Sequence, residues 1–125
     1  MLVVDDDPHL LTIAEEFLGR EDGFEVETAE NALDACRTIR EGTVDCVVSD
    51  YRMPAIDGMD LLETIRETEA VPFVMFTNKG SPELEARVKA VGDAVYLCKG
   101  LGLERYEMLA ETVRDIVGTG DRKVA

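Results

Sequence analysis

The feature that most constrains the fold is a fivefold alternation of short apolar runs with segments of helical periodicity. We predict strands at residues 2–4, 24–28, 44–49, 73–76 and 94–98, and helices that begin at Pro8, Asn31, Met59, Pro82 and Leu103. We expect Gly19 and Gly23 to end the first helix, Gly42 the second and Val117 the last. Five strand–helix units predict an α/β domain, because right-handed crossovers place helices on both faces of a parallel sheet.

The strand sequences also predict their order in the sheet. Residues 2–4, 44–49 and 73–76 are almost entirely apolar, as expected of central strands covered on both faces. Residues 24–28 instead alternate apolar and polar side chains, which is typical of an edge strand. This pattern favours the flavodoxin-like (βα)5 three-layer sandwich, with strand order 2-1-3-4-5, over the Rossmann order.

Length and charge limit the organisation and the partners of the chain. The 125 residues are enough for one domain, which we place at residues 1–118, with residues 119–125 as a C-terminal tail or linker. The net charge of −14 would repel phosphate backbones and anionic lipids, so we expect no direct nucleic acid and no membrane partner. The acidic excess is also similar to the surfaces of proteins from salt-loving organisms. No apolar run approaches 18 residues, and no secretion signal opens the chain, which predicts a cytoplasmic protein.

The sequence argues against several kinds of catalytic or metal site. A single histidine, His9, excludes a multi-histidine metal site, and two serines, Ser49 and Ser81, make a serine triad improbable. The cysteines are odd in number, lack CxxC spacing and lie in apolar segments, so we expect buried thiols rather than disulfides or metal ligands. They are Cys36, Cys46 and Cys98.

Polar side chains gather where the predicted strands end. Asp5 and Asp6 follow the first strand, Asp50 the third, Thr77 the fourth and Lys99 the fifth. In a parallel sheet of this order the ligand crevice lies beyond these carboxyl ends. Three converging carboxylates would repel one another unless a cation lay between them, and hard oxygen ligands suit Mg²⁺. Lys99 would offset the remaining charge, and the Thr77 hydroxyl could donate to a phosphoryl oxygen.

Each of these residues also has a purely structural interpretation. Asp7 before Pro8 is typical of a helix N-cap, and Asp50 could belong to the turn ahead of Pro54. Thr77 could lie in a plain loop, and a single lysine such as Lys99 is often only a solubilising residue. Their joint occurrence at strand ends favours a functional site.

Four segments in order carry a resemblance to a known family. They are Leu-Val-Val-Asp-Asp-Asp-Pro (2–8), Val-Val-Ser-Asp-Tyr-Arg-Met-Pro-Ala-Ile-Asp-Gly (47–58), Phe-Val-Met-Phe-Thr (73–77) and Tyr-Leu-Cys-Lys (96–99). Residues 2–117 resemble the receiver domain of two-component response regulators, including the single-domain regulators of the chemotaxis type. The resemblance implies a phosphorylated switch that catalyses its own modification and is not a turnover enzyme.

The resemblance also assigns roles to residues. It implies that Asp50 accepts a phosphoryl group from a histidine kinase. Asp6 and Asp50 would bind Mg²⁺ or Mn²⁺ directly, Asp5 through water, and Arg52 through its backbone carbonyl. The remaining matches are Thr77 and Lys99 as phosphoryl-binding groups and Tyr96 as the aromatic switch residue.

In this family, phosphorylation would shift the surface formed by the fourth helix, the fifth strand and the fifth helix. That surface would face an output domain or a downstream protein. Tyr96 could also be an ordinary aromatic residue of an edge strand.

The sequence departs from the family pattern near the expected site. Gly100 replaces the proline that usually follows the lysine, so we expect a looser loop around Lys99. Asn78 replaces a small residue after the threonine, and its bulk is expected to narrow the access of the kinase. Arg52 and Lys79 occupy positions that tune the access of hydrolytic water in the family.

Two other functions fit parts of this pattern. A receiver-like interaction module that does not switch is supported only by Asn78 and Gly100. A Mg²⁺-dependent phosphohydrolase of the haloacid dehalogenase group would need a carboxylate two residues after Asp50, where Arg52 stands.

Overall fold

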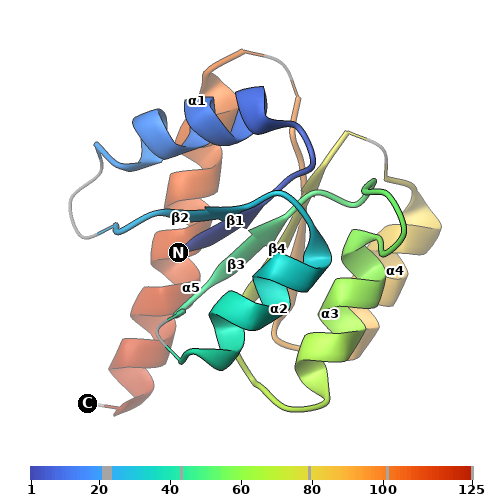
Figure 1. The fold of residues 1–125 in the computed structure, drawn as a ribbon. Coiled ribbons are helices and arrows are strands. Elements are labelled where there is room, and N and C mark those ends of the chain that lie inside the picture. The colour runs from blue at the N-terminus through green and yellow to red at the C-terminus, as the bar shows by residue number, and fades with distance from the viewer. Residues whose placement is uncertain (21–23, 43, 79, 101, 125) are drawn as a thin grey trace.

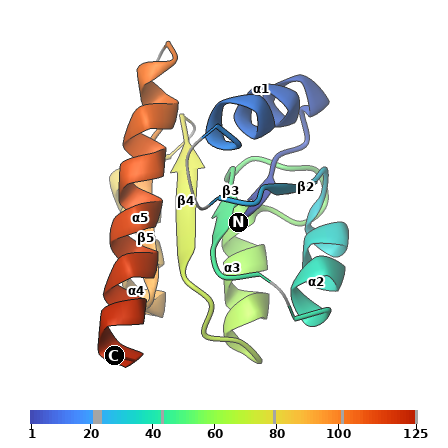
Figure 2. The same ribbon diagram turned by 90° about the vertical axis from the view of Figure 1, so that its left-hand side faces the viewer.

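A five-stranded parallel sheet lies at the centre of the protein, with helices on both faces (Figures 1 and 2). The computed structural model describes residues 1–20, 24–42, 44–78, 80–100 and 102–124, and the side chains of these residues through Val117. The strands are β1 (Leu2–Val4), β2 (Glu27–Ala29), β3 (Val47–Ser49), β4 (Phe73–Thr77) and β5 (Ala94–Cys98). Their order is β2-β1-β3-β4-β5, and every neighbouring pair is parallel. The predicted flavodoxin-like order is therefore confirmed.

Two predicted strands are shorter in the structure than in the sequence analysis. β2 covers 27–29 rather than 24–28, because its register pairs Glu27 with Leu2 at the start of β1. Phe24 and Val26 are half-buried and pack beside the sheet without belonging to a strand. β3 begins at Val47 rather than Val44, although the carbonyl of Cys46 already accepts a hydrogen bond from Leu2 N at 2.9 Å. The length of a strand is set by how many of its residues pair with a neighbouring strand. The periodicity of the sequence does not show how many residues pair.

The helices follow the expected rhythm. They are α1 (Pro8–Leu18), α2 (Ala32–Arg40), α3 (Gly58–Arg66), α4 (Pro82–Val91) and α5 (Glu104–Val124). Side-chain oxygens of four N-cap residues accept backbone N–H groups that have no partner inside the helix. These residues are Asp7, Asn31, Asp57 and Ser81. The N-cap interpretation of Asp7 is thus confirmed. Gly19 caps the end of α1, and Gly23, also expected to end it, lies outside the described residues.

The last helix is longer than predicted. It runs to Val124 instead of ending at Val117, so Gly118 and Gly120 do not stop it. Glycine in a helix costs roughly 1 kcal/mol relative to alanine, which lowers helical stability without forbidding the conformation. The division into a domain at 1–118 and a linker at 119–125 stays a prediction, since a linker can be helical.

Alternate residues of each strand face opposite layers, and two hydrophobic clusters result. In β1, Leu2 and Val4 belong to the cluster beneath α2, α3 and α4, whereas Val3 belongs to the cluster beneath α1 and α5. Figure 1 shows α1 and α5 on one side of the strands and α2, α3 and α4 on the other. Because β1, β3 and β4 are buried on both faces, polar groups are tolerated only where these strands end.

The expectation of three buried thiols was wrong in part. Cys46 is fully buried, Cys36 is half-buried and Cys98 is exposed. Cys98 ends β5, an edge strand, so its outer face has no neighbouring strand. Among the described residues, no helix combines the length and the apolar character needed to cross a bilayer.

Candidate functional site

The polar residues singled out in the sequence lie at one edge of the sheet. Asp5 and Asp6 follow β1, Asp50 follows β3, Thr77 ends β4 and Lys99 follows β5. The parallel pairing puts the carboxyl ends of β1, β3, β4 and β5 side by side. Residues separated by more than 90 positions in sequence, such as Asp5 and Lys99, are thereby brought into contact.

Lys99 joins the two buried carboxylates of this edge. Its Nζ atom lies 3.2 Å from Asp5 Oδ2 and 3.5 Å from Asp50 Oδ2. The three side chains are only 11%, 8% and 15% exposed for Lys99, Asp5 and Asp50. The ammonium also lies 5.7 Å from the ring centroid of Phe76, within range of a cation–π contact. Burial keeps solvent screening low, so this cation offsets the repulsion between Asp5 and Asp50.

Backbone amides hold the other oxygen of each carboxylate. Asp7 N donates to Asp5 Oδ1 at 3.0 Å, and Tyr51 N donates to Asp50 Oδ1 at 2.7 Å. Each carboxyl group is therefore fixed at one oxygen by the main chain and directs the second oxygen toward Lys99. This arrangement sets the orientation of Asp50 before any ligand binds.

The environment of Asp5 changes its acidity. Burial raises the pKa of the Asp5 carboxyl above its ordinary value, because a charged group is poorly solvated there. The Asp7 amide and the Lys99 ammonium oppose this rise, and the negative charge of Asp50 adds to it. The net rise shows that the protein alone does not fully compensate the charge of Asp5.

Asp6 completes a group of three carboxylates. Single oxygen atoms of Asp5, Asp6 and Asp50 lie within 4.8 Å of one another. Asp6 is exposed, and no hydrogen bond or ion pair joins its carboxylate to the described part of the chain. Hard oxygen donors at this spacing, one of them open to solvent, fit a divalent cation such as Mg²⁺. The acidic cluster is thus a suitable metal site.

The loop after Asp50 depends on the Asp57-Gly58 pair that ends it. Gly58 N donates to Tyr51 O at 2.8 Å, which closes the loop, and Asp57 forms a reciprocal capping box with Asp60 at the start of α3. A Cβ atom on Gly58 would come within 3.0 Å or less of the Asp50 carbonyl oxygen, Met75 Sδ and Tyr51 Cα. Only glycine lets α3 begin this close to Asp50. The Asp-Gly signal was visible in the sequence, but its role in placing Asp50 was missed.

The other predicted residues surround this centre. Thr77 is fully buried at the end of β4, and Arg52 is exposed in the loop after Asp50. Tyr96 is half-buried in β5 and packs against the cluster beneath α4, and burial raises the pKa of its phenol. Its hydroxyl lies against Gly80, where a Cβ atom would collide with it. Lys79 lies outside the described residues.

The two departures from the family pattern turn out to be in contact. Gly100 N donates to Asn78 Oδ1 at 2.9 Å, and Asn78 Nδ2 donates to Gly100 O at 3.3 Å. In the sequence these positions are two separate departures, and Gly100 alone predicts a looser loop. The loop is instead held by two hydrogen bonds, and no pattern in the sequence indicated this pairing.

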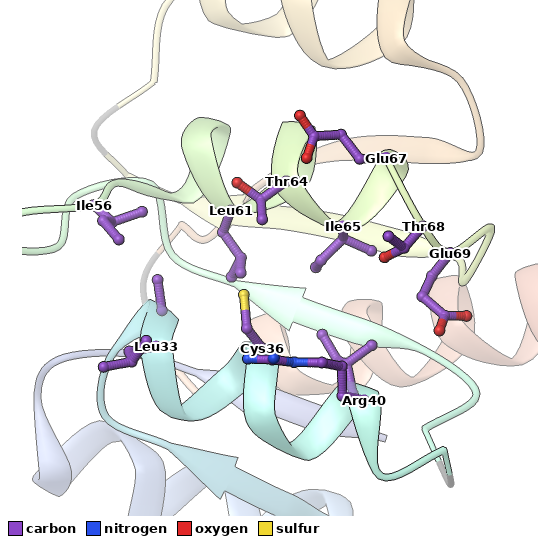
Figure 3. Close-up of a pocket in the computed structure, with 12 residues that line it drawn as sticks. Leu33, Cys36, Arg40, Ile56, Leu61, Thr64, Ile65, Glu67, Thr68 and Glu69 are labelled. Atoms are coloured by element: carbon purple, nitrogen blue, oxygen red, sulfur yellow. The ribbon is translucent and has the colours of Figure 1, made fainter.

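A larger groove lies elsewhere and contains none of these residues. It has a volume of about 370 Å³ and runs between α2 and α3 (Figure 3). Leu33, Cys36 and Arg40 face it from α2, and the sulfur of Cys36 points toward Leu61 of α3. Its walls are mainly aliphatic, and it lacks the converging carboxylates and lysine of the strand-end cluster. This apolar groove therefore lies apart from the candidate site, although ligand sites are often found in such grooves.

Comparison with known sequences identifies relatives with regulatory names. The model of the response regulator receiver domain matches residues 1–111. The two-component response regulator ARR11 of Arabidopsis thaliana is 33% identical over 130 residues, covering 96% of this chain and 25% of the relative. The transcriptional regulatory protein ResD of Bacillus subtilis is 31% identical over 99 residues, covering 79% of this chain and 41% of the relative. The chain thus spans less than half the length of each of these two relatives.

Solved structures of response regulators have the same fold as this chain and share part of its sequence. The chemotaxis protein CheY4 of Vibrio cholerae superposes with a TM-score of 0.80 at 28% identity, covering 92% of this chain and 95% of that one. The response regulator TrrA of Thermotoga maritima, in complex with Mg²⁺ and BeF, gives a TM-score of 0.76 at 28% identity, covering 92% and 96%. Together with the strand order, these matches show that the chain belongs to the receiver domain family of two-component response regulators.

Proposed function

We propose that this receiver domain is a phosphoacceptor, and that Asp50 takes a phosphoryl group from a phosphohistidine of a histidine kinase. The proposal depends on the contacts of the two carboxylate oxygens of Asp50. One of its oxygens is held by Tyr51 N at 2.7 Å, and the other lies 3.5 Å from the Lys99 ammonium. A carboxylate held in this way needs little reorganisation to act as a nucleophile.

The transfer requires one bond to form and one to break. A carboxylate oxygen of Asp50 attacks phosphorus as the bond from phosphorus to the donor imidazole nitrogen breaks, and the electron pair stays on that nitrogen. Phosphoryl transfer depends mainly on positioning and on charge neutralisation. Lys99 supplies a positive charge beside the attacking group, and Thr77, at the end of β4, would donate its hydroxyl to a phosphoryl oxygen. The domain would act once per modification rather than as a turnover enzyme.

The acidic cluster would hold the metal ion that such a transfer uses. Asp6 and Asp50 would be direct ligands, Arg52 would contribute its backbone carbonyl, and Asp5 would act through water. The direct role of Asp6 is supported by its exposed carboxylate, which no described residue engages. When bound, Mg²⁺ supplies the positive charge that three carboxylates and a phosphoryl group require. The Thermotoga relative, whose structure is a complex with Mg²⁺ and BeF, supports the same choice of metal.

Phosphorylation would act on the neighbouring strands. A phosphoryl group adds negative charge and strong acceptor oxygens at Asp50, which favours movement of Thr77 toward it. Tyr96, whose hydroxyl faces the loop that follows β4, would then change position. The surface of α4, β5 and α5 would carry the signal to an output domain or a downstream protein. The relatives ARR11 and ResD are much longer than the region that matches this chain, so they have room for further domains.

The test is phosphorylation in solution. With Mg²⁺ and acetyl phosphate or phosphoramidate, intact-mass measurement should show the addition of one phosphoryl group, and Asp50→Asn should abolish it. Asp57→Asn is a suitable matched control, because Asp57 is the helix cap of the same loop. A wild-type protein that gains no mass under these conditions would overturn the proposal. Beryllofluoride binding without any change in the NMR signals of Tyr96 would instead favour the alternative, a receiver-like interaction module that does not switch.

A further inference from the structure

The side chain of Asn78 bridges the two loops that follow β4 and β5. Its carboxamide exchanges two hydrogen bonds with the backbone of Gly100, at 2.9 Å from Gly100 N and at 3.3 Å to Gly100 O. The thiol of Cys98 lies 3.7 Å from the same Oδ1 atom. One side chain therefore contacts the residue before Lys99 and the residue after it.

These bonds continue the ladder between β4 and β5. Lys99 N donates to Thr77 O at 3.2 Å, which joins the two strands at their ends. A carboxamide offers one acceptor and N–H donors, as a peptide group does. The Asn78 side chain therefore pairs with both backbone groups of Gly100 in the way that another strand residue would. These bonds hold the backbone at Gly100, one residue beyond Lys99.

The Asn78 side chain and the Lys99 ammonium lie on different sides of the end of β5. Successive side chains at the end of an extended strand point to opposite faces, so Lys99 points away from the face of Cys98, whose thiol contacts Asn78. On that other side, Lys99 Nζ lies 3.2 Å from Asp5 and 3.5 Å from Asp50. We propose that Asn78 is a positioning residue, which restrains the backbone on both sides of Lys99 and so holds its ammonium between the two carboxylates. Its effect on phosphoryl uptake rests on the proposed function.

The pairing with Asn78 also requires a glycine at position 100. Its φ angle of +67° lies in the left-handed region that favours glycine. Its N–H is the donor of the shorter bond to Asn78. A proline here would lack that N–H and would hold φ near −65°. Asn78 and Gly100 therefore depend on each other, and Gly100→Pro should remove the restraint as fully as Asn78→Ala does.

The first experiment measures the restraint without any phosphoryl chemistry. Amide hydrogen exchange followed by NMR should be faster at Gly100 and Lys99 in Asn78→Ala than in the wild type, and the Lys99 ammonium signal should broaden. The matched control is Asn31→Ala at the only other asparagine of the chain, whose side chain also makes two hydrogen bonds, both with Asp34. It should leave Gly100 and Lys99 unchanged. Unchanged exchange at Gly100 in Asn78→Ala would overturn the proposal.

The second experiment asks whether Asn78 acts through Lys99. Asn78→Ala should lower the rate of phosphoryl uptake from acetyl phosphate roughly tenfold, the loss expected for two exposed hydrogen bonds of modest net strength. In a Lys99→Met background the same substitution should cause no further decrease, because the group it positions is gone. Equal decreases in both backgrounds would show a general structural role and would overturn the proposal.

The two experiments separate the failure of this inference from the failure of the proposed function. A wild-type protein that takes up no phosphoryl group contradicts the phosphoacceptor role, and the exchange at Gly100 and Lys99 then decides the role of Asn78. A wild-type protein that is phosphorylated, together with an Asn78→Ala variant that reacts equally fast, contradicts the positioning role alone.

Discussion

Two regions of this receiver domain differ in what holds their side chains in place. The groove between α2 and α3 is roomy, and aliphatic side chains from two helices line most of it (Figure 3). The cluster at the carboxyl edge of the sheet is crowded, and backbone amides and one lysine hold its carboxylates. The difference teaches that chemical capability follows from fixed, poorly solvated polar atoms rather than from the volume of a cavity.

The strongest test of this difference removes the lysine from the strand-end cluster. Lys99→Met leaves Asp5 and Asp50 buried without an opposing charge, so we expect a loss of roughly 3 kcal/mol in the free energy of unfolding at neutral pH without divalent ions. Urea unfolding measures this change. The loss should shrink as the pH falls, because a protonated Asp5, whose pKa burial already raises, needs no counter-charge.

Lys89→Met is the matched control for this substitution. Lys89 pairs with Glu85 at 3.0 Å on the surface of α4, and both side chains are well exposed. Exposed pairs one helical turn apart contribute roughly 0.5 kcal/mol or less. Similar losses for the two lysines would show that burial does not distinguish the strand-end cluster.

A smaller effect is expected from the glycine that lets α3 approach Asp50. Gly58→Ala places a Cβ atom against the Asp50 carbonyl oxygen and Met75, so we expect a loss of roughly 2 kcal/mol and slower phosphoryl uptake. The control is Gly42→Ala, where φ is +90° and nothing lies within 4 Å of the added atom. That variant should lose roughly 1 kcal/mol through backbone strain alone and keep its phosphoryl uptake. Unfolding curves and uptake rates of both variants distinguish crowding from strain.

Thiol chemistry compares the groove with the strand-end region in a single experiment. Burial raises the pKa of Cys36 in the groove, whereas Cys98 is exposed, so iodoacetamide at about pH 8 should modify Cys98 roughly tenfold faster. Burial raises the pKa of Cys46 to about 12, and this thiol should stay unmodified in the folded protein. Because the thiolate is the reactive form, the rate at Cys36 should rise with pH. Peptide mass mapping over time gives the order, and rapid labelling of Cys36 would contradict a sheltered groove.

The smallest effect is expected on the rim of the groove. Leu33 is 62% exposed, so Leu33→Ser should change the free energy of unfolding by no more than about 0.5 kcal/mol and leave phosphoryl uptake unchanged. Leu61 is fully buried in the groove wall, and Leu61→Ala should cost roughly 2–5 kcal/mol. A marked loss of phosphoryl uptake in Leu33→Ser would show that the groove and the strand-end cluster are coupled.

Much of the fold and of the candidate site could be predicted from local patterns. The contrast between apolar runs such as 73–76 and the alternating run 24–28 indicated which strands are central, and the observed order agrees. Asp50 and Lys99 were visible because each directly follows a strand. Strand lengths were not predictable, since each depends on pairing with strands that are distant in sequence.

Local patterns in the chain were enough to set the alternation of strands and helices, and hence the edge of the sheet where the polar residues gather. They did so because side-chain periodicity and helix caps act over a few residues. The tertiary structure alone decided that Lys99 lies between Asp5 and Asp50, that Gly58 presses against the Asp50 backbone, and that Asn78 pairs with Gly100. These contacts arise from strand register and loop closure, which bring together atoms whose separation in sequence carries no information about their distance in space.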